Sequence, residues 1–247
     1  MFQIFKNLDN QKLPIFIWFY IPIIFFLNIF LVKFINEDFF NNYFQKETGF
    51  IENGTFIILF LSIITCCFIL KKRNLFIFKK LFLFWIIIFL FGLIYFAGEE
   101  ISWGQQWFKW QTSDFFMNFN DQSETNFHNI SSWFDQKPRF ILLLFIFFGG
   151  IFIPFYLKIK KKKLYSRSVQ FWLFPNICCI PSAIICLFFY ILDNIYKFIC
   201  FGTPGIDIKC NYIPYLFVLR TSEILELFMS LFLFIYVLSI YSRLNKS

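Results

Sequence analysis

The stretch from Leu81 to Gln105, LFLFWIIIFLFGLIYFAGEEISWGQ, decides the fold. Its first part is an apolar run that is long enough, as a helix, to cross a bilayer core of about 30 Å. The run leads directly into two adjacent carboxylates, Glu99 and Glu100, and then into a polar segment. Two acids at the end of a span are costly unless they meet cations, water or a shared proton, so this junction also predicts a polar site.

The composition of the whole chain is that of a membrane protein. The 247 residues are 59% hydrophobic and 25% aromatic, with 44 Phe and only 15% charged residues, which excludes a soluble domain, a disordered chain and a disulfide scaffold. The net charge of +8 comes from short basic clusters between apolar runs. We interpret these clusters as topology signals and expect no nucleic-acid partner.

Six apolar runs predict an all-α polytopic transmembrane helix bundle, a single integral membrane domain over residues 1–247 with the lipid bilayer around it. Pro175 and Pro181 interrupt the fifth run and are expected to kink it. A helical re-entrant or interfacial segment is expected between spans three and four, with a break near 111–113. The predicted spans are about 14–35, 50–70, 78–97, 139–157, 171–199 and 213–241, and the polar segment is 98–138.

The basic residues predict the orientation. Placing both termini in the cytoplasm puts most Lys and Arg residues inside, which predicts a multi-pass protein of the cell (inner) membrane with segment 98–138 outside. The first apolar run is too long for the core of a removable signal peptide and is expected to stay in the protein. Cys200 and Cys210 flank a turn in a predicted outer loop, where the compartment permits a disulfide, and its formation is left open.

Carboxylates and one histidine in the polar segment are the main candidates for chemistry. Glu124 and His128, the only histidine in the chain, stand four residues apart and share a face on a helix. An exposed, hydrogen-bonded pair is the alternative. If the helix continues through the motif, Glu100 lies on one stripe and Glu99 on another. These stripes are Glu100, Trp103, Trp107 and Trp110, which also suit an interfacial aromatic belt, and Glu99, Ser102 and Gln106.

Two other predicted spans carry acids. Glu52 lies at the outer end of the second span, and Glu223 and Glu226 lie three apart in the sixth. An ionisable residue at membrane depth indicates a functional site, whereas an ion pair with Arg220 would be structural. We expect at least three groups in total, taken from these acids and from the candidates of the polar segment, to share one extracytoplasmic pocket. The candidate catalytic residues are Glu99, Glu100, Glu124 and His128, the candidate metal ligands are Glu100, Glu124 and His128, and the other candidate pocket residues are Glu52, Ser102, Gln105, Asn126, Glu223 and Glu226.

The motif GEEISWGQ at residues 98–105 resembles the signature of a family of uncharacterised bacterial multi-spanning membrane proteins. The resemblance continues through Asn120, Gln122, Glu124, Thr125, Asn126, His128 and Asn129. It extends weakly to acids near the second span, Glu47 and Glu52, and to the Glu223 and Glu226 pair. The chain departs from the pattern at Gln106, where a basic residue is common, and at Ser113, where Pro is common. The resemblance implies a shared site and supplies no activity.

Three functions fit these residues. A hydrolase or transferase would bind a divalent metal ion (zinc, iron or manganese), activate water and act on a lipid-linked substrate at headgroup depth. A small cation- or proton-coupled transporter would line its route with the acids of spans two, three and six. A noncatalytic subunit would dock a partner protein through the polar segment. Carboxylates that converge and bind a metal ion favour the enzyme, a continuous water path favours the transporter, and an exposed, unpaired loop surface favours the subunit.

Overall fold

The computed structural model describes residues 13–46, 48–72, 79–119, 125–127, 130–162, 164, 168–201 and 221–245. Within these ranges the regular structure is helical, and six stretches are long and apolar enough to cross a membrane, which confirms the predicted all-α polytopic bundle. These stretches are Phe16–Ile35, Phe50–Lys71, Lys80–Glu100, Gln136–Ile159, Val169–Tyr196 and Thr221–Leu244. The elements are η1 (Phe16–Tyr20), α2 (Ile21–Ile35), α3 (Glu37–Phe39), η2 (Phe40–Phe44), α4 (Phe50–Lys71), α5 (Lys79–Glu100), η4 (Ser102–Gly104), α6 (Gln105–Phe108), α7 (Asp114–Phe119), α8 (Ser132–Phe145), η5 (Ile146–Phe152), α9 (Ile153–Ile159), α10 (Val169–Leu173), η6 (Ile177–Cys179), α11 (Ile180–Phe201) and α12 (Thr221–Leu244).

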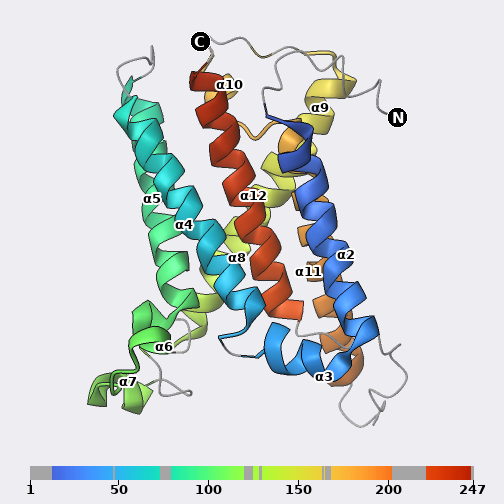
Figure 1. Ribbon diagram of the computed structural model, residues 1–247. Coiled ribbons are helices and arrows are strands. Elements are labelled where there is room, and N and C mark those ends of the chain that lie inside the picture. Colours follow the sequence, from blue (N-terminus) through green and yellow to red (C-terminus); the bar gives the residue numbers. More distant parts are fainter. Residues whose placement is uncertain are drawn as a thin grey trace.

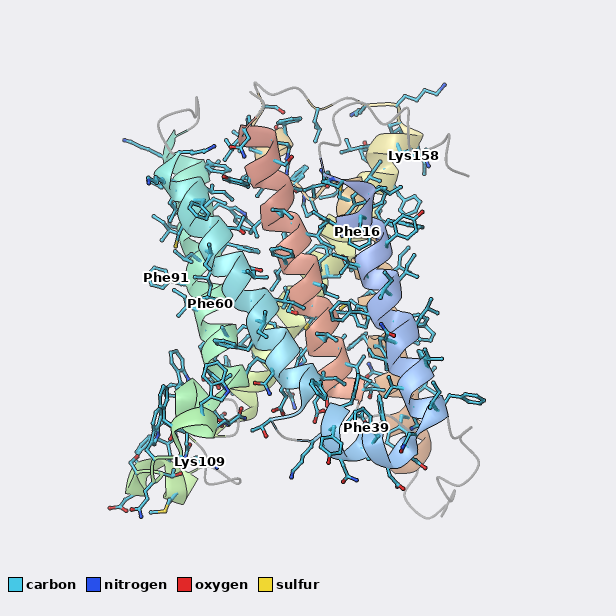
Figure 2. All side chains as sticks on the ribbon, in the orientation of Figure 1. Phe16, Phe39, Phe60, Phe91, Lys109 and Lys158 are labelled. Carbon is cyan, nitrogen blue, oxygen red and sulfur yellow. The ribbon has the colours of Figure 1, made fainter. Side chains whose placement is uncertain are left out.

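The long helices stand side by side and run in alternating directions (Figure 1). At one end of the bundle α4 and α12 begin, α2, α5 and α11 end, and α3, α6 and α7 lie. We call this the Glu100 end. The opposite end carries the exposed Lys71, Lys80 and Lys158, and we call it the basic end. Figure 2 shows Lys158 at the basic end and Lys109 at the Glu100 end.

Helix α12 is the core of the bundle. In the most apolar part of α12, 78% of the residues are buried inside the protein. The corresponding share is 22–39% in the other five spanning stretches. Helix α12 packs along α4 and α11, and α4 packs on α5. Because lipid surrounds the outer helices, large side chains such as Phe60 and Phe91 remain 50% and 66% exposed on the outside (Figure 2).

The fifth span is broken after α10. The break contains Pro175, as predicted, because proline cannot continue the hydrogen-bond pattern of a helix. Pro181 does not interrupt a helix, since it lies in the first turn of α11. The backbone N–H groups of a first turn have no acceptor within the helix, so a proline there breaks no hydrogen bond. The interruption predicted at two prolines is therefore confined to one.

Two side chains of α12 satisfy carbonyls at the break. Tyr236 Oη donates a hydrogen bond to the Leu173 carbonyl at 2.6 Å, and the Arg243 guanidinium donates to the Phe171 carbonyl. The last carbonyls of a helix have no partner within the helix and are costly in an apolar environment. These contacts therefore allow a broken helix inside the bundle.

Four of the five cysteines in the spans are buried packing residues, as expected. Cys66, Cys178, Cys179 and Cys186 are buried free thiols, and Cys67 is an exposed one. The side chains of Cys200 and Cys210 lie outside the described residues. The third span extends further than predicted, because α5 continues to Glu100 and so holds both adjacent carboxylates in its last turn.

Candidate functional site

The polar motif begins with a sharp turn after α5. Ser102, Trp103 and Gly104 have φ angles of 46°, 55° and 102°. Left-handed conformations cost a residue with a Cβ atom about 1–3 kcal/mol each. The helix of α5 therefore does not continue through the motif, because the chain changes direction at Ser102. The two stripes expected on that helix, Glu100 with Trp103, Trp107 and Trp110, and Glu99 with Ser102 and Gln106, do not form.

Glu99 fastens the polar segment to the end of α5. Its carboxylate is 6% exposed and accepts hydrogen bonds from Trp103 Nε1 at 2.6 Å and from the Phe127 backbone N–H at 2.8 Å. The Trp103 ring folds over Gly98, where a Cβ atom would lie 2.9 Å from ring carbons. Hydrogen bonds to an ionised acceptor are about twice as strong as neutral ones, so Glu99 is a strong anchor.

Three other predicted residues complete this attachment. Asn126 Nδ2 donates to Ser102 Oγ at 3.4 Å, and both side chains are fully buried. Gln105 donates through Nε2 to Thr112 Oγ1 at 2.6 Å and accepts from the Thr125 backbone N–H at 2.5 Å. We call Glu99, Ser102, Gln105 and residues 125–127 the clasp. It joins residues 20 to 28 positions apart in the sequence at the Glu100 end.

Glu100 lies among charged side chains from three other helices. The groups that act electrostatically on its carboxyl are Glu226, Glu52, Arg139 and Glu223. Glu52 is in the first turn of α4, Arg139 is in α8, and Glu223 and Glu226 are in the first two turns of α12. We call these five residues the Glu–Arg cluster. The structure thus brings together Glu52, Glu100 and Glu226, three of the groups that we expected to converge.

The Glu–Arg cluster contains more acids than cations. Arg139 Nη2 donates to Glu226 Oε1 in an ion pair between α8 and α12, with the two side chains 27% and 19% exposed. Arg139 is the only cation among the described residues that act on Glu100. Four ionised carboxylates with one cation would carry excess negative charge. Such a cluster is stabilised when some carboxylates bind a proton, or when water or a cation binds beside them. The cluster is therefore suited to exchange protons or to hold a cationic group.

Glu52 also stabilises the start of its own helix. Its Oε2 accepts a hydrogen bond from the Thr48 backbone N–H at 2.6 Å, and Asn53 Nδ2 donates to the Thr48 carbonyl at 2.7 Å. Thr48 has a φ of 67°, so these contacts hold a tight turn before α4. Glu52 therefore joins a structural cap to the Glu–Arg cluster.

Glu124 and His128 lie outside the described residues, as do Glu47, Asn120, Gln122 and Asn129. Within the described ranges, no three His, Cys, Asp or Glu side chains are grouped so that they could hold a metal ion. Among the described residues, the acids of the Glu–Arg cluster are thus not grouped as ligands of one metal ion.

Sequence reasoning missed Arg139. The sequence suggested a structural ion pair between Arg220 and Glu223 or Glu226. Arg220 is near these acids in the sequence but lies outside the described residues. The observed partner of Glu226 comes instead from another helix. The sequence did contain an indication of this pair, because Arg139 is a cation at the first position of the predicted fourth span. A cation at that depth is expected to pair with an acid at the same depth.

The end of the bundle thus holds two arrangements, the clasp and the Glu–Arg cluster. Clustered carboxylates can divide the roles of proton donor and proton acceptor, and a guanidinium can hold an anionic group beside them. No protein-family model, curated protein or solved structure matches the chain significantly. A function for this chain is therefore inferred from the chemistry of its site.

Proposed function

We propose that the chain is an integral membrane enzyme, a hydrolase or transferase, that acts on a lipid-linked substrate at the Glu100 end. The observation that carries this proposal is the convergence of Glu52, Glu100 and Glu226 from three helices. Ionisable groups at membrane depth are costly, and groups gathered there from separate helices are more typical of a site than of packing.

The carboxylates would supply acid–base catalysis. One carboxylate accepts the proton of the attacking water or acceptor hydroxyl as the new bond to the substrate forms. A protonated partner donates its proton to the leaving oxygen as the old bond breaks, so that protons balance over the reaction. Glu100 suits either role because three acids surround it, and Arg139 holds Glu226 in place.

Packing beyond the Glu–Arg cluster favours an enzyme over a transporter. On the side toward the basic end, Phe145 lies 5.8 Å from Phe232 and 5.4 Å from Tyr236, and Phe89 lies 5.2 Å from Tyr236, as distances between ring centroids. The buried Ser230 hydroxyl donates to a carbonyl of its own helix. A cation or proton route would need a continuous line of polar groups here, whereas the Tyr236 hydroxyl of this layer is already bound to Trp85 Nε1 and to the Leu173 carbonyl.

The segment around α6 and α7 supports a lipid-linked substrate. Large apolar side chains on it are exposed, and tryptophan and phenylalanine at the end of a span are typical of the membrane interface. The exposed fractions are 40% for Trp103, 47% for Trp107, 74% for Phe108, 41% for Trp110 and 58% for Phe115. The same surface is the observation that favours the second candidate function, a subunit that docks a partner protein.

We also propose that the Glu100 end faces outside the cell, in a protein of the inner membrane with both termini in the cytoplasm. The basic end carries Lys71, Lys72, Lys80 and Lys158. Positively charged residues concentrate on the cytoplasmic side of membrane proteins, which supports this orientation.

A divalent metal ion, zinc, iron or manganese, belongs to this proposal only if Glu124 and His128 supply ligands. Metal analysis of the detergent-purified protein tests this part. We expect Glu124→Ala and His128→Ala to lose a metal that the wild type retains. Equal metal content in all three proteins would show that Glu124 and His128 do not hold a metal ion.

Lipid analysis of proteoliposomes tests the function itself. The wild type, Glu100→Gln and the matched control Glu37→Gln, which changes an acid of α3 outside the cluster, would be reconstituted in bacterial lipid extract. We expect mass spectrometry to detect lipid turnover with the wild type and the control and a large loss with Glu100→Gln. Unchanged turnover in Glu100→Gln would refute the proposal, and cation flux without turnover would favour the transporter.

A further inference from the structure

Arg139 lies where the Glu–Arg cluster meets the lipid-facing surface of α8. The neighbouring side chains of Phe140, Ile141 and Leu144 are 55%, 66% and 39% exposed, as expected for a helix that contacts lipid tails. The side chain of Arg139 is itself 27% exposed while it binds Glu226. A charged group is therefore within reach of the membrane at the Glu100 end.

Within the described residues, helix α8 makes less close backbone packing with α12 than α4 and α11 do. Helices α4 and α11 pack along α12, whereas the close backbone packing of α8 within the described residues is with its own continuation, η5. Figure 1 shows α8 crossing obliquely behind α4 and α12. Near the Glu100 end, the ion pair between Arg139 and Glu226 links α8 to α12. A ligand from the membrane would meet this link before it reached Glu100.

A guanidinium binds a phosphate in the same two-pronged geometry as a carboxylate. The phosphate of a phospholipid headgroup can therefore take the place of the Glu226 carboxylate on Arg139. The Glu226 carboxylate would then lie beside the bound headgroup. Lysine would replace arginine only in part, because its ammonium binds a phosphate as a point charge without the planar fork.

The charges behind Arg139 select among headgroups. An anionic headgroup would meet repulsion from Glu100 and from Glu226 and Glu52, both of which act electrostatically on Glu100. A zwitterionic headgroup avoids this, since its phosphate meets Arg139 and its ammonium meets the carboxylates. An ethanolamine ammonium has three N–H donors for those carboxylates, whereas a choline group has none.

We infer that Arg139 receives the phosphate of an ethanolamine phospholipid, which reaches the Glu–Arg cluster from the membrane beside α8. This inference rests on the proposed function and names its substrate class. The carboxylates of Glu100 and Glu226 bind the ammonium group. The lipid tails stay against the apolar surface of α8.

Native mass spectrometry of protein from micelles that contain equal amounts of phosphatidylethanolamine, phosphatidylglycerol and phosphatidylcholine tests the inference. We expect the wild type to retain phosphatidylethanolamine preferentially, and Arg139→Gln to lower this retention by about tenfold or more. Lys137→Gln is the matched control, because it removes an exposed cation two residues away that lies over the Trp133 ring. Equal retention by Arg139→Gln and the wild type, or no preference among the three lipids, would overturn the inference.

Two further variants separate the contacts and protect against misfolding. Arg139→Lys keeps the charge and should keep the fold, yet we expect it to lose most of the retention. Glu100→Gln should lower the preference for phosphatidylethanolamine over phosphatidylcholine while phosphate binding persists. Full retention in Arg139→Lys would remove the role of the guanidinium, and an unchanged preference in Glu100→Gln would remove the role of the ammonium.

Free phosphate is the other possible source of the same chemistry. Addition of inorganic phosphate should not displace the bound lipid, and displacement would overturn the assignment to a lipid. The outcome is also distinct from that of the proposed function. Retention of phosphatidylethanolamine without lipid turnover would contradict only the enzyme, and turnover that survives Arg139→Gln without retention would contradict only this inference.

Discussion

Replacement of Glu99 by alanine should open the clasp without unfolding the bundle. The carboxylate holds Trp103 Nε1 at 2.6 Å and the Phe127 backbone N–H at 2.8 Å. Hydrogen bonds to a charged group contribute about 1.5–3 kcal/mol each, so loss of both costs at least about 3 kcal/mol. Since about 1.4 kcal/mol corresponds to a factor of ten, exchange of the Phe127 amide hydrogen should become faster by about 100-fold.

Hydrogen–deuterium exchange followed by mass spectrometry measures this change in the detergent-purified protein. Glu99→Gln should give an intermediate effect, because its one amide oxygen keeps an acceptor but loses the charge. Asp38→Ala is the matched control, since it removes an exposed carboxylate at the same end of the bundle. If the exchange of residues 102–127 were the same in Glu99→Ala as in the wild type, the clasp would not depend on Glu99.

Three other predictions concern packing and orientation. Gly150→Leu should lower the melting temperature, because a Cβ atom there would lie 2.6 Å from Phe232, whereas Gly92→Ala should be tolerated, because nothing lies within 4 Å. Tyr236→Phe should cost about 1–3 kcal/mol in a denaturant titration, since it loses hydrogen bonds to Trp85 and to the Leu173 carbonyl, and an equally stable variant would contradict this. In single-cysteine variants on intact cells, Lys109→Cys should react with an impermeant reagent and Lys158→Cys should not, and the reverse pattern would invert the orientation.

The spanning helices could be predicted because a bilayer fixes the length of an apolar run. The break at Pro175 could be predicted because proline lacks a backbone donor. The turn at Ser102 and Trp103 could not, since these residues rarely adopt positive φ and their local pattern suits a helix. The turn is held by the local bond from Trp103 Nε1 to Glu99 and by a contact from far along the chain, the Phe127 backbone N–H on Glu99.

The acids of the site could be predicted from their cost at membrane depth, but their partners could not. Glu52, Glu100 and Glu226 were identified one by one, and the sequence offered Arg220 as the nearest cation. Pairing between helices has no fixed spacing, unlike the contacts of residues three or four apart on one helix. The ion pair of Glu226 with Arg139 therefore required the arrangement of α8 against α12.

The central claim is that carboxylates from separate helices act as one site. The most direct test is the initial rate of lipid turnover in proteoliposomes for the wild type, Glu100→Gln, Glu226→Gln and the double variant. When two residues act as a unit, the effects of substituting them on the rate do not multiply in the double variant. We predict that the double variant is no slower than the slower single variant. Effects that multiply in the double variant, or turnover that neither substitution changes, would contradict a shared site.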